Sequence, residues 1–241
     1  SQKRSSIVRS TGNIGETSMT EITREERYWL WLSSVDGIGP VRFYDTLSVV
    51  TDLERAFHEC ASIPERVKSV TSRQGAALLA SANESYIDRL LELCARKKIH
   101  VLTRLNQDYP QILAEIENPP PVLFYKGYLP SFDERACALV GSRKPTKNGF
   151  SIIRSLANGL AGEGVVIVSG MARGIDTAAH MGALDANGVT AAVLGCGADV
   201  VYPPENHELY GRILERGAVI SEFLPGTEPK PQYFPQRNRI V

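Results

Sequence analysis

The sequence lacks the cysteine spacing of a zinc site and any apolar run long enough to cross a membrane. Its four cysteines, at positions 60, 94, 137 and 196, stand far apart, with no C-x-x-C pair and no histidine at ligand spacing. We therefore expect reduced thiols in the core of a cytoplasmic protein, with no metal site. No stretch of about 18 apolar residues occurs, and the polar beginning of the chain does not resemble a signal peptide, so no membrane partner is expected.

Familiar nucleotide-binding signatures are also missing. The chain has no G-x-x-x-x-G-K-[ST] loop, which argues against ATP hydrolysis of the P-loop kind. The nearest match to a dinucleotide fingerprint, residues 195–200, lacks the third glycine, and no suitably placed acidic residue follows it. We therefore expect no cofactor.

The chain has no excess of positive charge. Lys and Arg together number 27, as do Asp and Glu, so no global field attracts nucleic acid. Residues 140–180 are locally basic, however, with five Lys or Arg against two acidic residues. Any binding of nucleic acid must therefore come from a local patch.

The first part of the chain is predicted to be a tail followed by a small helical domain. Residues 1–20 are polar and aperiodic, which indicates a disordered tail. Amphipathic stretches over residues 21–98 predict helices, with a domain boundary near residues 97–105. The segment LSSVDGIGPVRFYDTL favours a SAM-like or helix-hairpin-helix-like domain. Its glycines either let the second helix present its N-terminus to a DNA phosphate or merely join two packed helices; only Arg42 adds positive charge there.

Strands and helices alternate regularly in the remainder, residues 99–241. The pattern predicts strands over 136–140, 165–169, 190–194 and 218–221, separated by helices over about 148–162, 174–187 and 206–216. This alternation indicates an α/β fold with a Rossmann-like parallel sheet. A short strand over 99–102 and a proline-rich approach to another strand precede it.

Polar, basic and glycine residues gather where the predicted strands end. In an open α/β sheet, ligands bind outside the carboxyl ends of the strands, so these residues predict a phosphate pocket. The candidates form three groups. Those after the strand at 136–140 are Gly141, Ser142, Arg143 and Lys144; those after the strand at 165–169 are Ser169, Gly170 and Arg173; and those near the end of the chain are Arg237, Asn238 and Arg239.

Several strand-end residues have structural alternatives. Ser142 and Ser169 can cap helices, and Asp176 can complement a helix dipole. Asp176 and His180 share a helix face, but no nucleophile is spaced to complete a catalytic site, so we expect a structural pair and no catalytic residue. Glu222 can tether Arg237 or Arg239.

Two aromatic residues near the predicted pocket also have two readings. Tyr202 and Phe234 are expected to be packing residues, with base stacking as the alternative.

Three ordered motifs carry a resemblance to a known family. LVGSRKPT at residues 139–146, VIVSGMARGID at 166–176 and FPQRNRI at 234–240 resemble the DprA family, also called Smf. The resemblance implies a non-enzymatic protein that binds single-stranded DNA and dimerises through its Rossmann-like domain. It further implies loading of the RecA recombinase onto strands covered by single-strand-binding protein during natural transformation. Arg143 and Arg237 match basic positions that grip DNA in the family.

The resemblance also bears on the extent of the chain and on one alternative. The family continues through further strands and helices, so we expect the sequence to be a fragment that lacks the C-terminal part of the domain.

The alternative to a DNA-binding protein is a nucleotide-binding enzyme of the phosphoribohydrolase type that uses the same pocket. The P-G-G-x-G-T stretch of that family is replaced here by LGCGADVVYPPEN at residues 194–206, which removes its catalytic feature.

Overall fold

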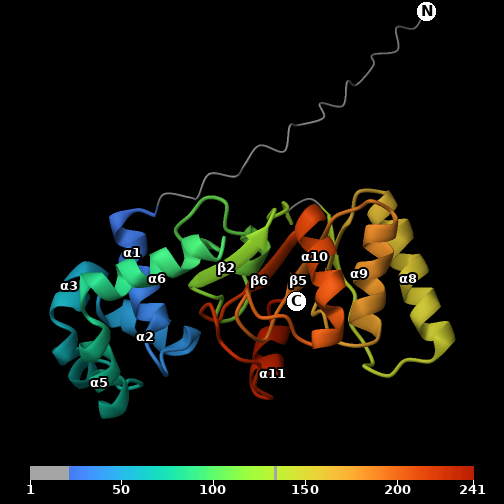
Figure 1. Ribbon diagram of the computed structural model, residues 1–241. Helices are drawn as coiled ribbons and strands as arrows, with labels where there is room; N and C mark the ends of the chain where they lie inside the picture. Colours follow the sequence, from blue (N-terminus) through green and yellow to red (C-terminus); the bar gives the residue numbers. More distant parts are fainter. Residues whose placement is uncertain (1–21, 133–134) are drawn as a thin grey trace, which may run out of the picture.

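The structure is a computed structural model that describes residues 22–132 and 135–241. A group of helices lies at one end of the molecule, a twisted sheet lies in the middle, and a layer of helices covers the sheet at the other end (Figure 1). The predicted disordered tail, residues 1–20, falls outside the described residues.

The helical part is built from short capped helices. In α1, the Thr23 hydroxyl accepts from the Glu26 amide and the Glu26 carboxylate accepts from the Thr23 amide, which is a capping box. The Asn83 side chain caps α6 by accepting from the Tyr86 amide at 2.8 Å. The helices are α1 (Arg24–Ser34), α2 (Pro40–Val49), α3 (Leu53–His58), the 3-10 helix η1 (Cys60–Ser62), α4 (Ile63–Arg66), α5 (Ser72–Ser81) and α6 (Glu84–Arg96).

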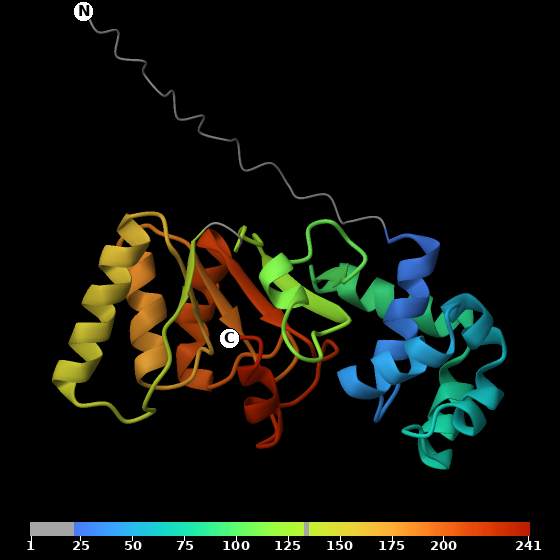
Figure 2. The same ribbon diagram turned by 180° about the vertical axis from the view of Figure 1, so that it is seen from behind.

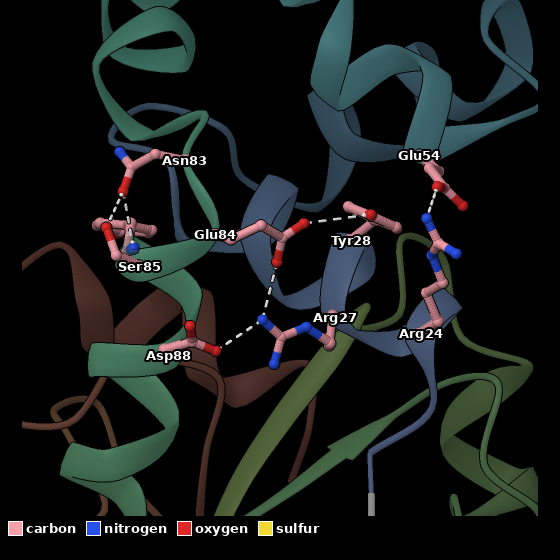
Figure 3. Close-up of polar contacts among 9 residues, drawn as sticks. Arg24, Arg27, Tyr28, Glu54, Asn83, Glu84, Ser85 and Asp88 are labelled. Carbon is pink, nitrogen blue, oxygen red and sulfur yellow. Dashed lines mark hydrogen bonds and ion pairs between the residues drawn. The ribbon is translucent and has the colours of Figure 1, made fainter.

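Polar contacts fasten α1 to α6 on the outside of this helical group (Figure 3). The Arg27 guanidinium donates to Glu84 at 2.8 Å and to Asp88 at 2.7 Å, both on α6. Inside the group, the buried Trp31 indole packs edge-on against Phe57 with ring centroids 5.0 Å apart. Burial of these aromatic side chains stabilises the packing of the helices.

The predicted hairpin connects α1 to α2. Gly37 has a φ of +81°, a conformation that side chains rarely adopt, and Gly39 precedes Pro40, the first residue of α2. Arg42 donates to the Ser69 carbonyl at 2.8 Å and to the Gly37 carbonyl at 3.2 Å. Arg42 therefore helps to hold the turn together, and Arg73 adds an ion pair with Asp36 at 3.3 Å.

The sheet has six strands in the order β1-β2-β6-β5-β4-β3. The four strands β3 to β6 are parallel, as the sequence predicts, while β2 pairs antiparallel with β6 and β1 antiparallel with β2. The Rossmann-like α/β fold is thus confirmed, with an antiparallel extension on one side. The strands are β1 (His100–Thr103), β2 (Val122–Gly127), β3 (Ala136–Ala138), β4 (Val166–Ser169), β5 (Thr190–Val193) and β6 (Ala218–Ser221).

Alternate residues of the parallel strands pack on opposite faces of the sheet. Helices α8, α9 and α10 cover one face of the sheet (Figures 1 and 2). Ile167, Ala192 and Val219 pack in the clusters on that face, whereas Val168 and Ile220 belong to clusters on the other face. β4, β5 and β6 are buried on both faces, as expected for parallel strands, whereas the edge strand β3 is partly exposed. The remaining helices are α7 (Gln111–Ala114), α8 (Lys147–Gly162), α9 (Ile175–Asp185), the 3-10 helix η2 (Pro204–Asn206), α10 (His207–Arg216) and α11 (Tyr233–Asn238).

The helical group and the sheet share buried surface. The hydrophobic cluster of the helices also contains Val101 of β1 and Phe124 of β2. The Thr103 hydroxyl donates to the buried Glu26 carboxylate at 2.8 Å, which connects β1 to α1. The helices therefore pack onto the antiparallel edge of the sheet, and the domain boundary near residues 97–105 stays a prediction.

Candidate nucleic-acid interface

The loops after β3 and β4 lie against one another at the carboxyl ends of the parallel strands. The Ile175 amide donates to the Ser142 carbonyl at 3.1 Å, which joins the two loops directly. Gly174 has a φ of +80° and sits so close to Ser142 that an added Cβ would collide with the Ser142 carbonyl oxygen. A larger residue at Gly174 would therefore separate the loops.

The loop after β3 presents its basic residues to solvent. Gly141, Ser142, Arg143 and Lys144 are all exposed. The Ser142 hydroxyl accepts from the Lys144 amide at 3.1 Å, which forms a tight turn. The Arg143 guanidinium lies 5.6 Å from the centre of the Phe234 ring, a cation–π contact between this loop and α11.

The loop after β4 is occupied by contacts within the protein. Ser169 is fully buried, and its hydroxyl donates to the Leu139 carbonyl at 2.6 Å. The amides of Gly170 and Ala172 donate to one oxygen of Asp176, at 3.1 Å and 3.3 Å. Arg173 is exposed and forms an ion pair with Glu205, including a contact of 3.0 Å. The Ser169 hydroxyl thus links the end of β4 to Leu139, and the Asp176 carboxylate occupies the space to which the loop amides point.

Arg237 in α11 and Arg239 at its C-cap have different partners. Arg237 is only 4% exposed, and its Nη1 donates to the carbonyls of Gly170, at 2.8 Å, and Val193. Burial lowers the pKa of Arg237, and the nearby Asp176 carboxylate opposes this shift. Arg239 forms an ion pair with Glu222, so the predicted tether by Glu222 forms with Arg239.

A cavity of about 410 Å³ opens between these elements. Its lining combines five of the ten candidate residues with Asp176: Gly141, Arg143, Gly170, Arg237 and Asn238. A smaller hollow beside it is lined by Arg143, Arg173, Tyr202 and Phe234. The rings of Tyr202 and Phe234 lie 5.4 Å apart and tilted, so these residues pack against each other while lining the smaller hollow. The exposed Arg143 lines both spaces, whereas the Arg237 guanidinium in the cavity wall is held by main-chain carbonyls.

The helix-face residues Asp176 and His180 are bonded to separate partners in the structure. His180 is fully buried, with Nδ1 2.7 Å from the Thr190 hydroxyl, and burial lowers the pKa of His180 to about 3. Asp176 is engaged with the loop amides. Each side chain therefore has a structural partner of its own.

The comparison with known proteins decides the family. The family model of DNA recombination-mediator protein A matches residues 100–241. The chain belongs to this family. The resemblance to DprA and Smf proteins that the three motifs carry is thereby confirmed.

Relatives in this family cover most of the chain. Protein Smf of Synechocystis sp. is 36% identical over 90% of the chain and 56% of its own length. DNA processing protein DprA of Streptococcus pneumoniae is 47% identical over 57% of the chain and 48% of its own length. The chain thus spans about half the length of these two relatives.

Two solved structures of the family share the fold. The X-ray structure of DprA from Streptococcus pneumoniae has a TM-score of 0.70 and 35% identity, and the match covers 92% of this chain and 75% of that one. A structure of DNA processing protein A from Helicobacter pylori, described for its single-stranded DNA binding mode, has a TM-score of 0.54 and 31% identity. That match covers 60% of this chain and 64% of the other.

Sequence reasoning missed the main role of Asp176 in this DprA-family fold. It treated Asp176 as a helix-dipole residue, whereas the structure uses its carboxylate as an acceptor for two loop amides. An acidic residue in the first turn after the glycine-containing loop is the signal that could have revealed this. The burial of Arg237 has no comparable local signal, because its acceptors lie 67 and 44 residues away in the chain.

The residues that the structure describes contain neither a metal-binding cluster nor a membrane-spanning helix. Across residues 22–132 and 135–241, no group of three or more His, Cys, Asp or Glu side chains is arranged to hold a metal ion. In the same ranges, no helix combines the length and apolar character needed to cross a membrane.

Proposed function

We propose that this protein binds single-stranded DNA in the cavity between the loops after β3 and β4 and α11. The observation that carries the proposal is the exposed Arg143 guanidinium at the mouth of the cavity, set against the Phe234 ring. Proteins that bind single strands combine cations for the phosphates with aromatic rings near the bases. The relative from Helicobacter pylori, described as binding single-stranded DNA, supports this proposal.

The same site is proposed to act without catalysis. The carboxylates of Asp176 and Glu222, near the strand ends, are both engaged: Asp176 accepts from backbone amides, and Glu222 is paired with Arg239. A general base must reach the proton that it removes, and these two groups are held by partners within the protein. Release of a free base from nucleoside monophosphates would instead favour the phosphoribohydrolase alternative.

The role in the cell is proposed from the family. Relatives named DNA processing protein and the family name recombination-mediator protein support a part in processing DNA during transformation. We propose loading of RecA onto strands covered by single-strand-binding protein, by a cytoplasmic homodimer that pairs through the Rossmann-like domain. Faster RecA strand exchange on such covered strands, measured with and without the protein, tests this role.

The proposed site is tested by Arg143→Ala. We expect weaker binding of fluorescent oligo-dT, because the variant loses an exposed cation at the cavity mouth. The slope of log affinity against log salt should become shallower by about 0.7 for one lost phosphate contact. Fluorescence anisotropy over a salt series measures both, with Arg89→Ala, an exposed arginine of α6, as the matched control. Equal salt slopes for parent and Arg143→Ala would refute the assignment.

A further inference from the structure

We propose that Asp176 is a positioning residue of the DNA site, acting through the loop after β4 and Arg237 and making no contact with DNA. This inference rests on the proposed function. Asp176 lies in the first turn of α9, is 5% exposed and borders the cavity. The position of this carboxylate at the cavity needs a physical explanation, because its negative charge repels the phosphates of a bound DNA strand.

The reason lies in what the carboxylate replaces. Loop amides that point toward one place form a concave site suited to an anion such as phosphate. Here Gly170 and Ala172 donate their amides to one oxygen of Asp176, at 3.1 Å and 3.3 Å. The anion site is therefore filled from within the protein. DNA phosphates are left to Arg143 on the neighbouring loop.

The loop held by Asp176 in turn holds Arg237. The Gly170 amide is bonded to Asp176, and the carbonyl of the same residue accepts from Arg237 Nη1 at 2.8 Å. A Cβ added at Gly170 would collide with the Arg237 guanidinium, so the two groups are in close contact. The negative charge of Asp176 also offsets the burial of the Arg237 cation.

This connection extends to the surface that faces DNA. Arg237 belongs to α11, which also carries Phe234, and Phe234 contacts the Arg143 guanidinium. A chain of contacts thus runs from Asp176 through Gly170 and Arg237 to the ring beside Arg143. Loss of the Asp176 carboxylate should loosen both the loop and α11.

Two variants separate positioning from simple loss of charge. Asp176→Ala removes the acceptor, and we expect binding of oligo-dT about tenfold weaker, the scale of one lost hydrogen bond to a charged group. Asp176→Asn keeps an oxygen acceptor for the amides, so it should recover most of the affinity. If carboxylate repulsion were its main effect, both variants would bind more tightly than the parent, and the proposal would be wrong.

Hydrogen exchange tests the same connection without DNA. In Asp176→Ala, peptides covering residues 170–176 and 233–238 should exchange faster, while α1 peptides exchange as in the parent. In Asp176→Asn, both peptides should exchange as slowly as in the parent. Unchanged exchange over 233–238 in Asp176→Ala would overturn the proposal whether or not the chain binds DNA. If exchange changes as expected but the parent binds no oligo-dT, the proposed function fails while the structural connection stands.

The control is Glu208→Ala, which removes an exposed acid from the first turn of α10. It should change neither oligo-dT binding nor exchange over residues 170–176 and 233–238. A global loss of protection in Asp176→Ala is recognised by faster exchange in α1. In that case the test rests on the Asp176→Asn variant. Exchange in this variant that equals the parent's over residues 170–176 and 233–238 supports the proposal, and faster exchange over 233–238 contradicts it.

Discussion

At the scale of single residues, the basic side chains near the cavity differ in what they can offer a ligand. Arg143 is exposed, whereas Arg237 is buried with its guanidinium on main-chain carbonyls. Arg173 is exposed but paired with Glu205. Glu205 therefore competes with any phosphate that approaches Arg173, since an exposed ion pair is weak and exchanges readily.

Glu205→Gln is expected to strengthen binding of single-stranded DNA. The change frees the Arg173 guanidinium, which lines the smaller hollow, and removes the negative charge paired with it. We expect an increase in affinity of about two- to fivefold at low ionic strength, fading at about 0.5 M salt as the charges are screened. Anisotropy titrations with oligo-dT measure it. Glu215→Gln, an exposed acid further along α10, is the control, and weaker binding by Glu205→Gln would contradict the prediction.

At the scale of elements, helix beginnings fix the loops that form the site. The loop after β3 leads directly into α8, and the Thr146 hydroxyl accepts from the Gly149 amide at 3.1 Å at the start of that helix. The loop after β4 leads into α9, whose N-cap Gly174 has no side-chain cap; there Asp176, in the first turn, accepts instead from the amides of the preceding loop. In both cases a side chain bonded to backbone amides sets where the loop ends.

Thr146→Ala is expected to destabilise the protein by about 1 kcal/mol, because α8 loses its N-terminal cap. Urea unfolding measures the free energy of unfolding. Thr146→Ser should keep most of the stability, since it retains the hydroxyl. Ser155→Ala, at an exposed position within α8, should change the stability by less than about 0.5 kcal/mol. The capping role is wrong if Thr146→Ala and Ser155→Ala have equal stabilities.

At the scale of the whole molecule, the helical group and the sheet are joined by more than the connecting chain. They share the cluster that includes Phe124, and they are bridged by Thr103 to Glu26 and by an ion pair between Lys97 and Asp199. Asp199 also accepts from the Gly226 amide at 2.8 Å, in the segment that leads to α11. The helices thus support loops on the sheet side of the molecule.

We therefore expect the helices and the sheet to unfold in one transition. Both tryptophans of the chain, Trp29 and Trp31, lie in α1, so their fluorescence reports the helical group alone. Hydrogen exchange in β4 and β5 reports the sheet. Coincident midpoints in urea for the two probes are the expected result. An earlier loss of tryptophan signal would show that the helices unfold separately.

Much of this molecule follows from the sequence alone. The alternation of apolar strand segments and helices after residue 136 predicts the parallel strands β3 to β6, because parallel strands are joined by helical crossovers. The same pattern places the basic and glycine residues of two loops at one end of the sheet. The motifs at 139–146, 166–176 and 234–240 are sufficient to indicate the family.

Only the tertiary structure decided which of these residues face the cavity. Ser169 turned inward to the Leu139 carbonyl, Asp176 filled the loop amides, and Arg237 reached carbonyls far away in the sequence. The physical reason is that a buried polar group must find a partner, and the nearest partner depends on which distant segments pack together. Periodicity and motifs determine the strands and their order along the chain, whereas packing determines where each charge is satisfied.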